Sequence, residues 1–182
     1  MAHFISIQEA MNKGSGEVAV RGWVYRERGS NKLKFIVLRD VSNIIQCVVE
    51  KGDVGEELFE TATKLQVESS IEIEGEIKED KRAPTGYEIK VKKLIVIGES
   101  YTFPITKDQS VEFLADNKHL WLRSRKMTAV MKIRSTVFGA IHAYFRNKGF
   151  YEHHSPIFQS TQCEGGSTLF QVNYFGSKMY LS

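Results

Sequence analysis

Apolar positions recur with a period of two along several segments in the first hundred residues. In residues 17–27, every second position from Val18 to Val24 is apolar or glycine. A period of two places these side chains on one face of the chain, so the segment predicts a strand with one buried face. Residues 34–39 and 44–49 are rich in β-branched and other apolar residues and predict two further strands. Gly, Ser, Asn and Asp separate these segments and predict tight turns between them.

A short helix and two more strands complete the pattern of this region. Apolar residues recur at helical spacing in residues 54–66, and alternation returns in residues 70–77 and 87–97. Three strands, a helix and two strands in about 100 residues is the order of an OB-fold, a five-stranded barrel whose open face often binds oligonucleotides. Gly22 and Gly75 lie within predicted strands, where the missing side chain permits the sharp coiling of a small barrel.

The pattern changes after residue 100. Residues 101–125 show no sustained periodicity and predict a connector. Residues 124–148 carry one wide apolar stripe and predict a long helix, which Gly149 would end. A helix of about 25 residues is roughly 37 Å long. Because few residues follow it, we expect its stripe to contact a further domain or a second subunit.

Composition indicates a globular protein with no membrane segment. The 182 residues are 42% hydrophobic and 26% charged, and no apolar run approaches the roughly 20 residues that span a bilayer. The N-terminus lacks the basic and apolar regions of a signal peptide, so we expect a cytoplasmic protein.

Charge is uneven along the chain, although the net charge of +3 is small. Residues 21–40 contain six basic residues, with Glu27 and Asp40 as their only acids. The basic residues are Arg21, Arg26, Arg28, Lys32, Lys34 and Arg39. A local positive patch of this kind suits a polyanionic partner better than the net charge alone suggests.

Cysteine and histidine residues give no sign of a metal site. Cys47 and Cys163 are far apart in sequence, and neither belongs to a CxxC pair. The histidines form no HxH or HxxxH pair, and no Walker-type phosphate loop or GxSxG serine is present. We therefore expect no metal site and no catalytic residue within this chain.

Beyond these patterns, several segments resemble one known family. Residues 148–158, Lys-Gly-Phe-Tyr-Glu-His-His-Ser-Pro-Ile-Phe, resemble motif 1 of the class II aminoacyl-tRNA synthetases. Residues 161–170, Thr-Gln-Cys-Glu-Gly-Gly-Ser-Thr-Leu-Phe, resemble the asparaginyl enzymes of archaeal and eukaryotic type. The region around Gly22-Trp23-Val24 and Arg39-Asp40 is similar to the anticodon-binding barrel of the aspartyl and asparaginyl subgroup. The resemblance covers nearly the whole chain.

The family resemblance implies an architecture and an activity. It implies an all-β OB-fold barrel that binds the tRNA anticodon in residues 1–100, a hinge in residues 101–125, and the incomplete start of an α+β class II catalytic domain in residues 126–182. The implied activity is the ATP-dependent attachment of asparagine to tRNA(Asn) through Asn-AMP, with ATP and Mg²⁺ as cofactors. The family's ATP-binding motifs would follow Ser182, so we expect the chain alone to be inactive.

Four barrel residues match anticodon-binding residues of the family. Phe35 matches an aromatic residue that stacks on the central uridine of a GUU or GUC anticodon, and Gln46 matches a residue that hydrogen-bonds an anticodon base. Arg26 and Arg28 would contact phosphates or the first anticodon base. The alternatives are a core phenylalanine and ordinary surface residues. The strand period places Phe35 opposite Ile36 but does not decide which face is buried.

Three residues outside the barrel also acquire roles from the resemblance. Glu164 matches the loop glutamate that holds the α-ammonium group of the amino acid, a charge-assisted contact. The long helix, with Phe138, and the motif 1 strand, with Pro156, would build a homodimer interface. The alternatives are a solvated loop glutamate and an ordinary edge-strand or turn proline.

Two other functions remain open at this stage. An aspartyl-tRNA synthetase, discriminating or not, shares every motif quoted, and the residues that would distinguish aspartate from asparagine lie beyond Ser182. A non-catalytic OB-fold module that binds RNA is the second alternative, but it leaves the long helix and the Glu-Gly-Gly loop without a function.

Overall fold

The computed structural model describes residues 3–106, 109–161 and 169–181. The chain forms two compact units, Met1–Ser110 and Val111–Ser182. The hinge and domain boundaries expected from the sequence remain predictions. Among the described residues, no helix combines the length and apolarity that a membrane span requires.

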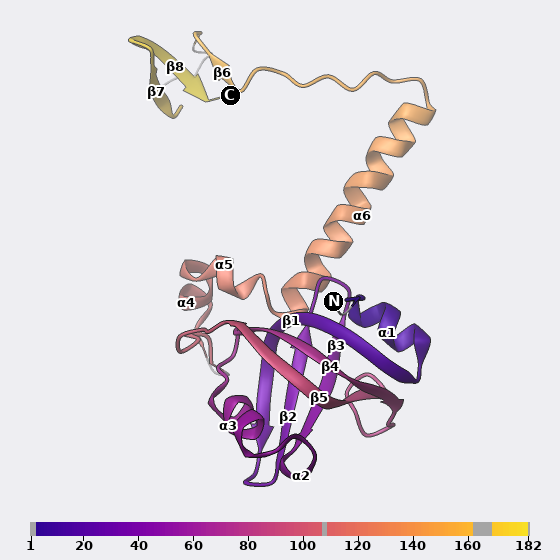
Figure 1. Ribbon diagram of the computed structural model, residues 1–182. Helices are drawn as coiled ribbons and strands as arrows, with labels where there is room; N and C mark the ends of the chain where they lie inside the picture. Colours follow the sequence, from indigo (N-terminus) through magenta and orange to yellow (C-terminus); the bar gives the residue numbers. More distant parts are fainter. Residues whose placement is uncertain (1–2, 107–108, 162–168, 182) are drawn as a thin grey trace. The chain divides into compact units, whose positions relative to one another are not determined.

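The first unit is a closed five-stranded barrel, which confirms the predicted OB-fold (Figure 1). Its strands follow one another around the barrel in the order β1-β2-β3-β5-β4. Their bounds are β1 Gly16–Gly29, β2 Leu33–Arg39, β3 Ile44–Glu50, β4 Ser70–Glu79 and β5 Tyr87–Gly98. Neighbouring strands are antiparallel except β3 and β5, whose parallel pairing closes the barrel.

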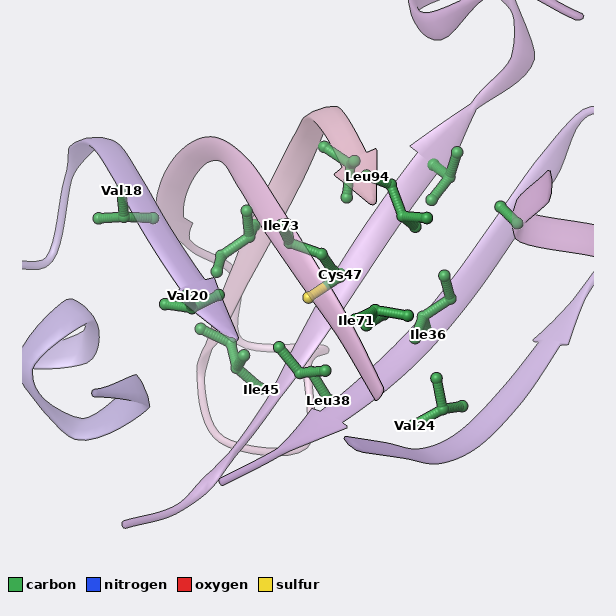
Figure 2. Packing of buried hydrophobic residues seen from close by; sticks show 14 of the residues in the cluster. Val18, Val20, Val24, Ile36, Leu38, Ile45, Cys47, Ile71, Ile73 and Leu94 are labelled. Atoms are coloured by element: carbon green, nitrogen blue, oxygen red, sulfur yellow. The ribbon is translucent and has the colours of Figure 1, made fainter. Parts of the chain in front are cut away.

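Alternate side chains of all five strands fill the barrel (Figure 2). Val20 and Val24 of β1, Ile36 and Leu38 of β2, and Ile45 of β3 are fully buried. The period of two in the sequence therefore identifies the inner face of β1 up to Val24, whereas β2 and β3 show no such alternation and only the structure identifies their inner face. Burial of this aliphatic set is the main stabilising contribution to the unit.

Two glycines allow the strands to coil tightly enough to close the barrel. A Cβ atom at Gly22 would lie 2.3 Å from the Arg39 carbonyl oxygen, and one at Gly75 would lie 2.2 Å from the Lys90 carbonyl oxygen. The register of β4 on β5 also shifts between Glu74 and Gly75, as at a bulge. These close backbone approaches agree with the role that the sequence predicts for both glycines.

The helix predicted in residues 54–66 is confirmed as α3 (Glu56–Lys64), and a separate one-turn helix, α2 (Lys51–Val54), comes directly before it. The two helices are separated by Gly55, whose φ of 80° lies in the left-handed region. Glycine adopts this conformation without the steric cost that other residues incur, so the chain breaks there. From α3, Phe59 and Ala62 pack into the barrel core.

An N-terminal helix, α1 (Ile7–Lys13), does not follow from the hydrophobic period used above. Ser6 caps it, with Glu9 completing a capping box, and this Ser-x-x-Glu spacing is the sequence signal for the helix.

Asp40 also accepts a hydrogen bond from the Ile7 amide, at 2.8 Å. Partial burial opposes ionisation of Asp40, but hydrogen bonds from Ser42, Ile7 and Asn43 outweigh it and lower its pKa.

The second unit contains three helices and a small antiparallel sheet within its described residues. The helices are α4 (Val111–Asp116), α5 (Lys118–Trp121) and α6 (Arg125–Asn147). The sheet has the order β6-β8-β7, from Phe158–Gln159, Ser177–Leu181 and Gln171–Tyr174. Ser124 caps α6 by accepting a hydrogen bond from the Met127 amide, and Gly149 follows the helix with a φ of 84°. The predicted long helix is therefore present.

The close approach at Gly75 predicts a specific cost for a side chain there. Gly75→Ala should lower the free energy of unfolding by about 1–3 kcal/mol, because the backbone of Lys90 must move. Gly52→Ala is the control, since its Cβ would meet no atom within 4 Å. Urea unfolding would measure both, and equal stability of the two variants would contradict this account of barrel closure.

Candidate functional site

A hollow of about 230 Å³ on the first unit brings together all four barrel residues predicted from the sequence. It is lined by Arg26, Glu27, Arg28, Phe35, Val37, Gln46 and Pro84. The lining residues come from β1, β2, β3 and the connection between β4 and β5. A larger hollow of about 480 Å³ elsewhere on the unit contains none of the four predicted residues.

A bulge in β1 places the two arginines on the same face as Phe35. Before the bulge, the buried Val24 pairs with the buried Leu38. The register then shifts, and Arg26 pairs with Val37 while Arg28 pairs with Phe35. Uninterrupted alternation would have placed both arginines on the inner face with Val24. The extra residue reverses this parity and makes the outer face basic.

Phe35 lies on the outer face of the barrel. Ile36 and Leu38 of the same strand are fully buried, whereas Phe35 is partly exposed and lies outside the core cluster. The guanidinium carbon of Arg28 lies 5.2 Å from the centroid of the Phe35 ring, within cation–π range. The alternative of a core phenylalanine is therefore wrong.

Gln46 is a buried polar residue in the wall of the hollow, with 5% of its surface exposed. Its Nε2 donates a hydrogen bond of 3.1 Å to Oε2 of Glu88. Its Oε1 is buried and accepts no hydrogen bond from the part of the chain that the structure describes. The side chain thus presents one satisfied donor group and one acceptor that lacks a donor.

Glu88 is the residue that sequence reasoning missed. It is 7% exposed, and its Oε1 lies 3.1 Å from Nζ of Lys78. The parallel register of β3 on β5 places it beside Gln46, and the antiparallel register of β4 on β5 places it beside Lys78. No local pattern in the sequence shows this register, so the sequence alone gave no signal for the contact.

The surroundings of the hollow are mainly positive. Arg26 and Arg28 are exposed, and the guanidinium carbon of Arg26 lies 5.4 Å from the centroid of the Tyr25 ring. Glu27 forms an ion pair with Lys34, at 2.8 Å. A flat aromatic ring, a buried acceptor and two exposed guanidinium groups form a suitable site for an unstacked nucleic-acid base and its phosphates.

The remaining predicted residues are not part of this hollow. Phe138 is on α6 and is 57% exposed. Pro156 is exposed and precedes the short strand β6, so the expectation that it lies within a strand was wrong. A strand needs a neighbour for its hydrogen bonds, and the described residues of this chain provide one only from Phe158 onward. Glu164, and Cys163 beside it, lie outside the described residues.

Neither the cysteine nor the acidic and histidine residues of the described ranges form a metal site. Within those ranges, no group of three or more His, Cys, Asp or Glu side chains could hold a metal ion. Cys47 is fully buried in the barrel core, and burial raises the pKa of its thiol. This thiol is therefore a core side chain.

Comparison with known families divides the chain into two matched regions. Residues 18–97 match the family described as OB-fold nucleic acid binding domain. Residues 110–182 match the family described as tRNA synthetases class II (D, K and N). The two matches together include the barrel, α6 and the small sheet.

Comparison with individual proteins gives a consistent result. The chain is 48% identical to the asparagine–tRNA ligase of Thermoplasma acidophilum over 180 residues, which cover 98% of this chain and 42% of that relative. It is 48% identical to the Thermococcus gammatolerans asparagine–tRNA ligase over 165 residues, 91% of this chain and 38% of that relative. The chain therefore spans about two fifths of the length of these relatives.

Solved structures show the same relationship. The asparaginyl-tRNA synthetase from Pyrococcus horikoshii, complexed with asparaginyl-adenylate, matches with a TM-score of 0.89 and 40% identity, over 100% of this chain and 43% of that one. A putative aspartyl-tRNA synthetase from Leishmania major matches with a TM-score of 0.84 over 100% of this chain and 38% of that one. At 24% identity, the second match shows a shared fold only.

The outward position of Phe35 predicts a small contribution to stability. Ile36→Ala should lower the free energy of unfolding by about 2–5 kcal/mol, because Ile36 is fully buried. Phe35→Ala should cost less, about 1 kcal/mol, because its ring is already partly in contact with solvent. Chemical denaturation of the two variants would test this order. If Phe35→Ala lowered the free energy of unfolding more than Ile36→Ala, Phe35 would have to be a core residue.

Proposed function

The chain belongs to the class II aminoacyl-tRNA synthetases, in the group that serves aspartate, lysine and asparagine, and we propose that it supplies the anticodon-binding barrel and the start of the catalytic domain of an asparagine–tRNA ligase. The relatives at 48% identity and the solved structure at 40% identity support asparagine as the amino acid. The proposed activity of the whole protein is the ATP-dependent formation of Asn-tRNA through Asn-AMP.

The single observation that carries the RNA-binding part is the gathering of Arg26, Arg28, Phe35 and Gln46 in one hollow. In this proposal, an anticodon base stacks on the Phe35 ring, and Gln46 hydrogen-bonds the edge of the base. Arg26 and Arg28 contact the phosphates on either side. Base–aromatic stacking contributes roughly 1–3 kcal/mol per base, and guanidinium groups bind phosphate strongly.

Aspartate is the second candidate amino acid. The chain has the fold of a putative aspartyl-tRNA synthetase, but the identity of 24% is well below the 48% identity to asparagine enzymes. The third candidate is a barrel that binds RNA without catalysis. The match of residues 110–182 to the synthetase family favours the first two, because that region has no use in an RNA-binding barrel alone.

Amino-acid activation needs ATP and Mg²⁺, which the family implies for the whole protein. Within the described ranges, no group of three or more His, Cys, Asp or Glu side chains converges. We propose that this chain contributes the binding of tRNA and a contact with the amino acid. Glu164 is the proposed partner of the α-ammonium group, by family resemblance.

A homodimer is the proposed assembly, with α6 at its interface. Apolar side chains of α6 are exposed within the second unit, among them Ile133, Val137, Phe138, Ile141 and Phe145. A stripe of this size on one helix needs a covering surface. A second copy of the chain is the proposed partner, and Pro156 is proposed to lie at the same interface. Such a synthetase would act in the cytoplasm.

Anticodon binding can be tested with an RNA hairpin that carries a GUU anticodon. Phe35→Ala should weaken binding about tenfold to a hundredfold, because a stacking contact worth roughly 1–3 kcal/mol is lost. Tyr101→Ala is the aromatic control, since Tyr101 is 93% exposed and does not line the hollow. Fluorescence titration would measure the affinities.

Salt dependence separates the arginines from the aromatic residue. Arg26→Ala should reduce the slope of log affinity against log salt by about one if Arg26 contacts a phosphate, whereas Phe35→Ala should leave the slope nearly unchanged. If Phe35→Ala binds the hairpin with normal affinity and Arg26→Ala leaves the salt slope unchanged, the proposed site is ruled out.

Dimerisation through α6 predicts a specific effect of charge. Phe138→Glu should shift the chain toward monomer in sedimentation at micromolar concentration, because a carboxylate would be buried at the interface. Thr136→Glu, an exposed position on the opposite side of the same helix, should leave the association unchanged. The interface assignment fails if the wild-type chain is already a clean monomer.

A further inference from the structure

Residues 117–151 of the second unit carry an unbalanced positive charge. They include eight Lys and Arg residues and no Asp or Glu. Basic side chains of the first unit are often paired with acids, as in Lys90–Asp53 and Lys93–Glu74. The stretch that contains α6 thus differs from the barrel in its electrostatics, and it suits an anionic partner.

Four cations of α6 form no ion pair with the residues that the structure describes. They are Arg125, Lys126, Lys132 and Arg134, and all four are exposed. Arg146, near the other end of the helix, is paired with Glu152. Positive charge without a partner is therefore concentrated in residues 125–134.

Helix stability does not account for these cations. α6 contains no Asp or Glu, so none of them belongs to a stabilising i,i+4 pair. The helix dipole favours acids in a first turn, as with Glu9 in α1 and Glu56 in α3, whereas α6 has Arg125 and Lys126 there. Neighbouring cations also repel one another. A bound anion would offset both unfavourable contributions.

Arg125 and Lys132 lie on one face of α6. They are seven residues apart, which at about 100° per residue leaves only about 20° between their directions. Thr128 and Thr136 lie within about 60° of both cations, whereas Phe138 of the apolar stripe lies more than about 100° from either. We call Arg125, Thr128, Lys132 and Thr136 the basic face of α6. This face is separate from the apolar stripe proposed as the dimer interface.

We propose that the basic face of α6 binds the phosphate backbone of tRNA outside the anticodon arm, as a second RNA contact of the chain. This inference rests on the proposed function, in which the chain binds a tRNA. RNA is the expected anion because residues 18–97 match nucleic-acid-binding domains and residues 110–182 match tRNA synthetases. Guanidinium and ammonium groups bind phosphate without reading sequence. The basic face would therefore contribute affinity and salt dependence but no choice of base.

The test compares the binding of two RNAs by the 182-residue chain. One is a full-length tRNA with a GUU anticodon, and the other is the hairpin of its anticodon arm alone. The tRNA should bind more tightly, with a slope of log affinity against log salt that is steeper by about two, because each phosphate contact releases about one counterion. Fluorescence titration at several salt concentrations would measure both slopes.

The double variant Arg125→Gln, Lys132→Gln should remove this difference in slope and weaken tRNA binding about tenfold at moderate salt. Its affinity for the hairpin should stay unchanged, because the hairpin lacks the contacted phosphates. Glutamine suits these positions, since its helix propensity is close to that of arginine and lysine. Lys132→Arg should keep the difference in slope, because the charge is retained.

A barrel cation provides the matched control. Lys93→Gln also removes one positive charge, but from an ion pair of 2.9 Å with Glu74 on the first unit. It should leave the difference in slope between the two RNAs unchanged. Thermal melting would show that each variant is folded, and sedimentation would show that the double variant keeps the self-association of the wild-type chain.

The outcomes separate this inference from the proposed function. If neither RNA binds, or if Phe35→Ala leaves hairpin binding unchanged, the proposed anticodon site fails. If the hairpin binds in a Phe35-dependent way but the tRNA shows no steeper slope, only the second contact is overturned. It is also overturned if the steeper slope survives in the double variant, or if that variant loses self-association, because the cations would then act at the subunit interface.

An anionic membrane is the other surface that such a face could bind. Vesicles of phosphatidylcholine and phosphatidylserine should not co-sediment with the wild-type chain. Co-sedimentation that depends on Arg125 and Lys132, together with equal salt slopes for the two RNAs, would assign the basic face to a membrane and contradict the proposal.

Discussion

The parallel pairing of β3 with β5 is the constraint on which the candidate site depends. It closes the barrel, and it places Gln46 beside Glu88, residues 42 positions apart in sequence. Closure in turn requires the backbone approaches at Gly22 and Gly75, where no side chain would fit. The β3–β5 pairing therefore serves both the closure of the barrel and the contact between Gln46 and Glu88.

Burial of polar groups at this position works against stability. Gln46 and Glu88 are two of only three buried polar side chains that the described part of the chain contains, and the oxygen of Gln46 has no partner. Apolar side chains at these two positions would give a more stable barrel, because buried polar groups lose their hydrogen bonds with water. Such a cost is expected where a protein keeps a recognition group ready for a ligand.

The barrel was predictable from the sequence because the patterns that indicate its strands and turns each lie within a short segment of the chain. The period of two located β1, β4 and β5, and the content of β-branched and apolar residues located β2 and β3, each within a few residues. The polar breaks located the turns. The site was only partly predictable: family resemblance supplied Phe35 and Gln46, but the bulge after Val24 reverses the parity that alternation implies for Arg26 and Arg28. Glu88 could not be found, because its contact depends on a register between distant strands. α1 had a readable signal, the capping box from Ser6 to Glu9, outside the hydrophobic period.

The closing pair of strands also separates folding into local and distant steps. The pairings β1–β2, β2–β3 and β4–β5 join strands that follow one another in sequence, whereas β1–β4 and β3–β5 must bring together segments separated by two helices and at least one other strand. Pairings over such distances carry a larger loop-closure entropy and form slowly. A chain arrested before this step would keep much of its strand content and still lack the Gln46–Glu88 contact. Binding of RNA in the hollow, which β1, β2, β3 and the β4–β5 connection line together, would therefore report complete closure of the barrel, which circular dichroism alone would not.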